Sequence, residues 1–173
     1  EKVESGADAP LRPYLSLSRT LDKVRPGGVI AFITSKGTMD KENPNVRKYI
    51  AQRADLLGAI RLPNDTFKAA AGTEVTSDII FLQKRYRLVD IEPDWVHLAT
   101  DANGIRMNAY FVDNPEMVLG DMQMVSGPHG MESACIAYEN AELGDLLRDA
   151  TLMCAISASR WWTARFITVK TAA

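Results

Sequence analysis

The chain has 173 residues, enough for one domain with a real hydrophobic core but too few for two large ones. Its hydrophobic share of 46% and charged share of 24% are those of an ordinary soluble protein. No apolar run approaches the ~18 residues that cross a membrane, so a membrane protein is excluded and a cytoplasmic one is expected. Cys135 and Cys154 have neither metal-ligand spacing nor partners for a disulfide framework, and we expect free thiols.

The net charge of −2 conceals a division along the chain. Residues 36–87 carry a net charge of +4, whereas residues 88–150 carry −10. Because phosphate is attracted to a basic face and repelled by an acidic one, a DNA contact is expected only from the first of these segments. The acidic segment is expected to face solvent or another part of a longer protein. The chain begins at Glu1 without a methionine, which suggests a piece of such a protein.

The first elements in chain order are a leader, a helix and a strand. Residues 1–14 are polar and predict a frayed leader, and Leu17, Leu21 and Val24 then form the apolar stripe of a helix. Residues 29–33 are apolar without alternation. This pattern predicts a strand buried on both faces, as in a parallel sheet covered by helices.

Polar residues 34–38 follow that strand at its carboxyl end, the edge at which open α/β sheets bind ligands. A plain turn explains these residues equally well. Asn43 before Pro44 predicts the start of a helix over residues 44–54, whose charged side chains most simply form a solvated face.

Two further strands are predicted at residues 55–63 and 77–83. The polar stretch 64–76 between them has no room for a crossover helix. The two strands are therefore expected to be antiparallel neighbours.

Five stretches between residues 15 and 85 form a distinctive series: Leu21–Thr34 (LDKVRPGGVIAFIT), Val46–Ile50 (VRKYI), Leu56–Pro63 (LLGAIRLP), Phe67, and Thr73–Lys84 (TEVTSDIIFLQK). The series resembles the adenine-specific, amino-methylating DNA methyltransferases of restriction-modification systems, in particular the methylase–helicase fusions of bacterial mobile elements. In that family the α/β domain has a seven-stranded Rossmann-like (class I) sheet, whose last strand is antiparallel and lies between its neighbours.

The resemblance implies that the three strands here are the fifth, sixth and seventh of that sheet. Residues 15–87 are then the C-terminal half of a methyltransferase-like domain. Residues 88–150 are then a less regular acidic α+β extension. With the first four strands absent, the strand at 29–33 has an unpaired edge, and we expect self-association or marginal stability.

The resemblance also implies roles for side chains. Phe67 occupies the place of the aromatic residue that stacks on an adenine flipped out of the duplex, and Thr34 and Ser35 help to wall the pocket of that base. Lys36, Arg61 and Lys68 are candidates for contacts with DNA phosphates. A flipped base needs an aromatic face, worth roughly 1–3 kcal/mol per stacking contact. The alternatives remain that Phe67 packs onto its own domain and that each cation is simply exposed.

The sequence lacks two motifs of that family. It has no Gly-rich turn for S-adenosylmethionine and no Asn-Pro-Pro-Tyr/Phe, so we assign no catalytic, cofactor-binding or metal-binding residue, and expect no cofactor on this chain alone. S-adenosylmethionine, the catalytic motif and the N-terminal half are expected in the parent, with a helicase domain as a further partner. The sequence therefore favours the target-base half of a DNA adenine methyltransferase that is inactive alone. The alternative is a non-catalytic DNA-binding or assembly module.

The acidic extension gives weaker signals. Residues 93–98 and 109–112 are expected to be short strands around the turn 101–104, and Asn114–Pro115 is expected to begin a helical turn. The methionines at 122, 124 and 131 suggest a flexible loop, and residues 139–150 suggest an acidic helix.

The tail 151–173 contains no acidic residue and includes Trp161 and Trp162. It is interpreted either as a basic aromatic element or as an interrupted sequence, of which we favour the second.

Overall fold

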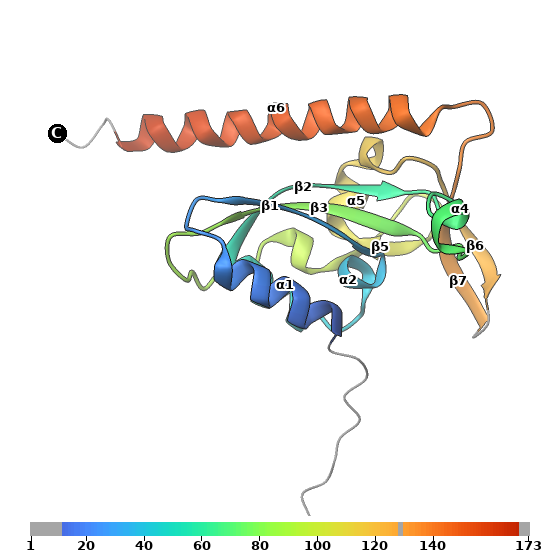
Figure 1. Ribbon diagram of the computed structural model, residues 1–173, viewed down its shortest axis with the longest axis horizontal. Coiled ribbons are helices and arrows are strands. Elements are labelled where there is room, and N and C mark those ends of the chain that lie inside the picture. Colours follow the sequence, from blue (N-terminus) through green and yellow to red (C-terminus); the bar gives the residue numbers. More distant parts are fainter. Residues whose placement is uncertain (1–11, 128–129, 170–173) are drawn as a thin grey trace, which may run out of the picture.

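A three-stranded sheet forms the centre of the computed structural model, which describes residues 12–127 and 130–169 (Figure 1). Its strands β1 (Val29–Ser35), β2 (Ala54–Leu62) and β3 (Ser77–Lys84) lie in the order β1-β3-β2. β3 is antiparallel to both neighbours, so β1 and β2 run parallel to each other. The predicted antiparallel pairing of the second and third strands is confirmed, and the last strand lies between the other two. The described residues form a mixed α/β structure with this sheet and two small antiparallel ones.

Helices lie on both faces of the sheet, as Figure 1 shows. One face packs against α1 (Arg12–Lys23), α2 (Gly37–Asp40) and α3 (Asn45–Arg53), and the other carries α6 (Leu143–Val169) over β2. The predicted apolar stripe of α1 reaches the core, where Leu17 and Leu21 are buried. Most of the predicted leader lies outside the described residues, and α1 already begins at Arg12.

The prediction that residues 29–33 are buried on both faces is wrong. Ile30 is 7% exposed, whereas Val29 and Ile33 are each 60% exposed, so burial alternates along β1. The cause lies in the covering of the sheet. The helices α1 and α2 contact β1 on one face, while α6 contacts β2, which lies on the far side of β3 from β1.

The acidic segment begins with a 3₁₀ turn, η1 (Asp94–Val96), and a hairpin of β4 (Leu98–Thr100) and β5 (Arg106–Asn108). The expected turn is present, and Asp101 stabilises it by accepting N–H bonds from Asn103 and Ile105. The expected strand at 109–112 is wrong: α5 (Ala109–Asp113) replaces it, because Asn108 caps the helix by accepting from the Tyr110 N–H. The helical turn η2 (Pro115–Met117) follows as expected.

The methionine-containing stretch is a second hairpin rather than a loop. It consists of β6 (Asp121–Gly127) and β7 (Gly130–Ile136), which pair antiparallel along their whole length. α6 then places Leu143, Leu146 and Leu147 against the core, as expected, and continues without a break past residue 151. None of the described helices combines the length and apolar character that crossing a membrane requires.

Candidate functional site

The carboxyl ends of β1 and β2 meet at one edge of the central sheet, because the two strands are parallel. This edge therefore holds both the turn after Ser35 and the loop 64–76 after β2. Ser35 is exposed, while Thr34 is half-buried and its Oγ1 lies 2.6 Å from Thr38 Oγ1. The structure thus brings Thr34 and Ser35 to the edge where the sequence predicts the base pocket. Their role in binding a base stays a prediction.

Phe67 lies in the loop on the same edge, directly before the short helix α4 (Lys68–Ala71). Its ring is half-buried and packs against the hydrophobic core, so it is neither sealed inside the protein nor fully free. The loop closes on itself through a 2.8 Å bond from the Val75 N–H to the Asn64 carbonyl. Gly72 ends α4 with a left-handed φ of 68°, a conformation that favours glycine. These bonds hold a defined loop with one aromatic ring near its start.

Lys36 connects the end of β1 to the β6–β7 hairpin. Its Nζ donates to the carbonyl of Ser133, lies 3.1 Å from that residue's hydroxyl, and lies 4.0 Å from a carboxylate oxygen of Glu132. Burial lowers the pKa of Lys36, while Glu132 and Asp40 oppose this shift. In this conformation Lys36 holds the hairpin to the sheet, and a phosphate contact requires its ammonium to exchange partners.

Arg61 is no longer a candidate for a phosphate contact. It is 0% exposed and lies between two carboxylates, with Nε and Nη2 bonded to Asp78 at 2.9 and 3.0 Å and Nη2 bonded to Asp40 at 2.9 Å. Its guanidinium carbon also lies 4.3 Å from the ring centre of Phe111. Burial lowers the pKa of Arg61, but the carboxylates outweigh burial, so the pKa is raised. A guanidinium enclosed in this way is not accessible to a DNA phosphate.

Lys68 is the most accessible of the three predicted phosphate ligands. Its side chain is 63% exposed, and Nζ pairs with Glu74 at 2.6 Å across the loop. The hydrogen bond to Glu74 raises the pKa of Lys68, which therefore stays charged at neutral pH. Exposed pairs of this kind contribute little to stability, so Lys68 can leave Glu74 at small cost. Its phosphate contact stays a prediction.

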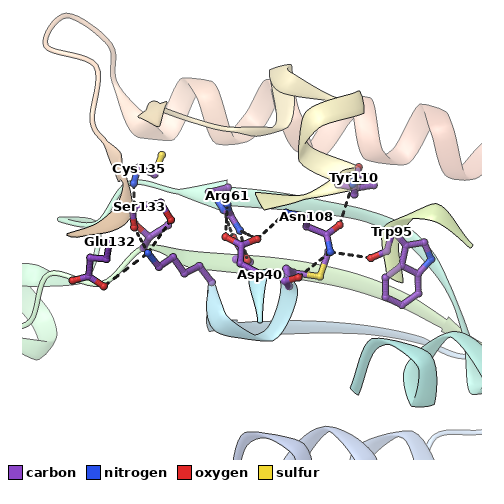
Figure 2. A network of polar contacts seen from close by, with 12 residues as sticks. Asp40, Arg61, Trp95, Asn108, Tyr110, Glu132, Ser133 and Cys135 are labelled. Carbon is purple, nitrogen blue, oxygen red and sulfur yellow. Dashed lines mark hydrogen bonds and ion pairs between the residues drawn. The ribbon is translucent and has the colours of Figure 1, made fainter. Parts of the chain in front are cut away.

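Sequence reasoning missed the polar network that joins the acidic segment to the sheet (Figure 2). Asn108 is 0% exposed: its Nδ2 donates to the carbonyls of Met39 and Trp95, and its N–H donates to Asp40. Asp40 in turn binds Arg61, so one chain of polar contacts runs from β2 to α5. The signal was present in the sequence, since Arg61 and Asp78 are opposite charges inside two apolar strand segments.

Two hydrogen bonds made by the backbone of Cys135 also join the hairpin to the loop 64–76. The Cys135 N–H donates to Thr76 Oγ1 at 2.9 Å, and the Asn64 N–H donates to the Cys135 carbonyl at 2.8 Å. The Cys135 thiol is 0% exposed, and burial raises its pKa to about 12. Within residues 12–127 and 130–169, no three His, Cys, Asp or Glu side chains gather into a metal-binding group. The candidate site is therefore a polar edge with one aromatic ring and two amines.

Comparison with known proteins gives a restriction-related context. No family model matches the chain. A segment of 67 residues is 36% identical to part of the "Defense against restriction protein B" of Escherichia phage P1. This segment is 38% of the present chain and 3% of the phage protein, so the chain spans only a small part of that relative's length. Over this segment the chain is therefore similar to part of a protein that is named for restriction defence.

Proposed function

We propose that residues 15–87 are the target-base-recognition half of an S-adenosylmethionine-dependent, adenine-specific DNA methyltransferase, working within a larger restriction-related protein. The main support is the arrangement around Phe67. An antiparallel β3 lies between parallel β1 and β2, and the loop bearing Phe67 leaves the carboxyl end of β2. The motifs between residues 21 and 84 resemble those of DNA adenine methyltransferases, and the phage relative is a restriction-defence protein.

The chemistry of the loop suits a base that has left the duplex. An extruded adenine loses its stacking neighbours, and an aromatic face restores roughly 1–3 kcal/mol of that loss. Phe67 is partly exposed, is preceded by the polar segment 64–66, and lies beside the accessible ammonium of Lys68. Thr34 and Ser35 lie on the same edge of the sheet and offer hydroxyl groups to a polar base edge.

Methyl transfer needs parts that this chain does not contain. The methyl donor and the Asn-Pro-Pro-Tyr/Phe motif are assigned to the remainder of the larger protein. In this proposal the present chain supplies the surface that receives the base, and the remainder supplies the cofactor and the acceptor oxygens for the exocyclic amine.

The test separates aromatic stacking from packing, because Phe67 also contacts the core. Phe67→Leu keeps an apolar side chain, whereas Phe67→Tyr keeps the aromatic face. Binding of the chain to a duplex with one unpaired adenine is measured by fluorescence anisotropy, beside the same duplex fully paired. We expect Phe67→Leu to weaken binding to the unpaired adenine about 5- to 150-fold and Phe67→Tyr to retain it.

The control variant is Tyr86→Leu, which changes an 80% exposed aromatic residue outside the loop and is expected to leave binding unchanged. Equal affinity of the wild-type chain and Phe67→Leu for the unpaired adenine contradicts the proposal. In a protein that also carries the catalytic half, Phe67→Leu should lower methyl transfer while S-adenosylmethionine binding survives.

A non-catalytic DNA-binding or assembly module is the second candidate function. The assembly role is the one favoured by the structure, because the enclosure of Arg61 and the contact of Phe67 with the core leave few groups free for DNA. The two candidates differ in one measurement. A module that only binds DNA or assembles gives the same affinity for paired and unpaired adenine, and Phe67→Leu leaves methyl transfer by the larger protein unchanged.

A further inference from the structure

The strand β7 presents one side of its backbone to the carboxyl ends of β1 and β2. Residues two apart in a strand direct their N–H and C=O groups to the same side, and Ser133 and Cys135 are such a pair (Figure 2). The Ser133 carbonyl accepts from Lys36 Nζ, while the Cys135 N–H and carbonyl bond Thr76 and Asn64. This side of β7 thus joins the residues that follow β1 and β2 to the residue that precedes β3.

Cys135 bonds both ends of the loop 64–76, which carries Phe67. Its N–H donates to Thr76 Oγ1 at 2.9 Å, where the loop enters β3. Its carbonyl accepts from the Asn64 N–H at 2.8 Å, where the loop leaves β2. Cys135 is 0% exposed and Thr76 is 4% exposed, so these contacts lie away from solvent. One residue of β7 therefore fixes the two ends of the loop.

Phe67 follows Asn64 by only three residues, and hydrogen-bonded turns connect them. The Thr66 N–H and hydroxyl both donate to the Pro63 carbonyl, at 3.2 and 2.8 Å. The Phe67 carbonyl accepts from the Ala71 N–H at 2.7 Å, which ties the backbone of Phe67 into α4. Because the chain between Asn64 and Phe67 is folded into turns, a displacement of Asn64 is passed on to the aromatic ring.

The start of the hairpin is itself fixed to the sheet. The Leu119 N–H donates to the Arg61 carbonyl at 2.9 Å, beside a parallel bridge between Arg61 and Val118. Gly120 then passes close to β7, since a Cβ at this position would overlap the Ile136 carbonyl oxygen. The side chain of Arg61 is held by two carboxylates, so the hairpin is anchored to a buried ion cluster before it reaches the loop.

We propose that the β6–β7 hairpin positions the loop bearing Phe67 for an extruded adenine, with Thr76 as a positioning residue that acts through the Cys135 N–H. This inference rests on the proposed function, and it gives the acidic segment a role at the base site although its charge repels phosphate. Thr76 is buried and acts without touching DNA. Its hydroxyl raises the fraction of chains whose loop holds the ring in the binding arrangement, and the apparent affinity is proportional to that fraction.

The test replaces Thr76 with valine and with serine. Thr76→Val keeps the shape of the side chain but removes the acceptor of the Cys135 N–H, whereas Thr76→Ser keeps the hydroxyl and should restore the wild-type behaviour. Fluorescence anisotropy gives the preference of each chain for a duplex with one unpaired adenine over the fully paired duplex. One ordinary hydrogen bond shifts a population about 2- to 10-fold, so we expect Thr76→Val to lower this preference by that factor. Thr100→Val makes the same change at an exposed threonine of β4 and is the matched control.

Amide hydrogen exchange reports on the loop without DNA. We expect faster exchange over residues 64–76 in Thr76→Val than in the wild type, Thr76→Ser and Thr100→Val, with circular dichroism showing which chains are folded. Lys36→Met releases Ser133 and is a second variant in which loop exchange should rise. Wild-type exchange in every folded member of this pair of variants overturns the proposal.

The two proposals fail in different ways. A folded Thr76→Val that keeps the wild-type preference, while Phe67→Leu loses it, overturns the positioning role and leaves the base-recognition role standing. Equal affinity of the wild type and Phe67→Leu for the unpaired adenine overturns base recognition instead. Hydrogen exchange then decides by itself whether the hairpin positions the loop.

Discussion

Replacing Asp78 with alanine tests how the buried Arg61 stabilises this fold. Both side chains are 0% exposed, and the carboxylate binds the guanidinium through Nε and Nη2 at 2.9 and 3.0 Å. Asp78→Ala removes both charge-assisted bonds and leaves the cation buried with Asp40 as its remaining anion. Breaking a buried ion pair from one side costs about 3–5 kcal/mol. Since Asp40 still compensates the charge in part, we expect the lower end of that range, about 3 kcal/mol.

Urea denaturation at pH 7, followed by far-ultraviolet circular dichroism, measures this loss in the free energy of unfolding. Asp145→Ala is the matched control, because Asp145 forms an ion pair of 2.7 Å with Arg148 on the exposed surface of α6. Both of those side chains are at least 70% exposed, and we expect a loss below about 0.5 kcal/mol. A loss of less than about 1 kcal/mol for Asp78→Ala refutes the reasoning, as does a loss equal to that of the control.

Two further predictions concern α6 and the thiols. Gly58→Ala places a methyl group 2.6 Å from Cys154 Sγ, so we expect urea denaturation to show a free energy of unfolding lower by about 1–3 kcal/mol. Cys154→Ala removes that sulfur, so in the double variant part of the lost stability should return. Strictly additive losses in the two single variants and the double variant contradict the contact. Burial raises the pKa of the Cys135 thiol to about 12, so at pH 8 it carries almost no thiolate. Both cysteines are buried, and Ellman's reagent is therefore expected to react with them only after unfolding; rapid reaction of the native chain contradicts this placement.

Local sequence patterns predicted the central sheet well. The strands, their approximate limits and the antiparallel pairing of β2 with β3 follow from apolar runs and from a connection too short for a crossover. The burial of β1 was predicted wrongly. A run of apolar residues indicates that both faces of a strand are covered, but it does not say which chain segments cover them. The exposed Val29 and Ile33 show that the described residues do not cover both faces of β1.

The acidic segment was predicted less well, for physical reasons that particular residues make clear. Residues 109–112 are apolar enough for a strand, but the side chain of Asn108 satisfies the first free N–H and starts a helix. The methionines at 122, 124 and 131 predict a loop where the structure has the hairpin 121–136, on which Met124 and Met131 are exposed. The Gly-Pro-His-Gly sequence at 127–130, a turn signal between two short segments, could have revealed it.

At the candidate site, charge alone was a poor guide to function. Lys36, Arg61 and Lys68 were equivalent in the sequence as possible phosphate ligands, yet they have different surroundings. Arg61 is enclosed by carboxylates, Lys36 is bound to the hairpin, and Lys68 is exposed. This difference depends on strand register, because Arg61 faces Asp78 across β2 and β3. Once two neighbouring strands are predicted, their register shows whether opposite charges within them face each other, as Arg61 and Asp78 do here.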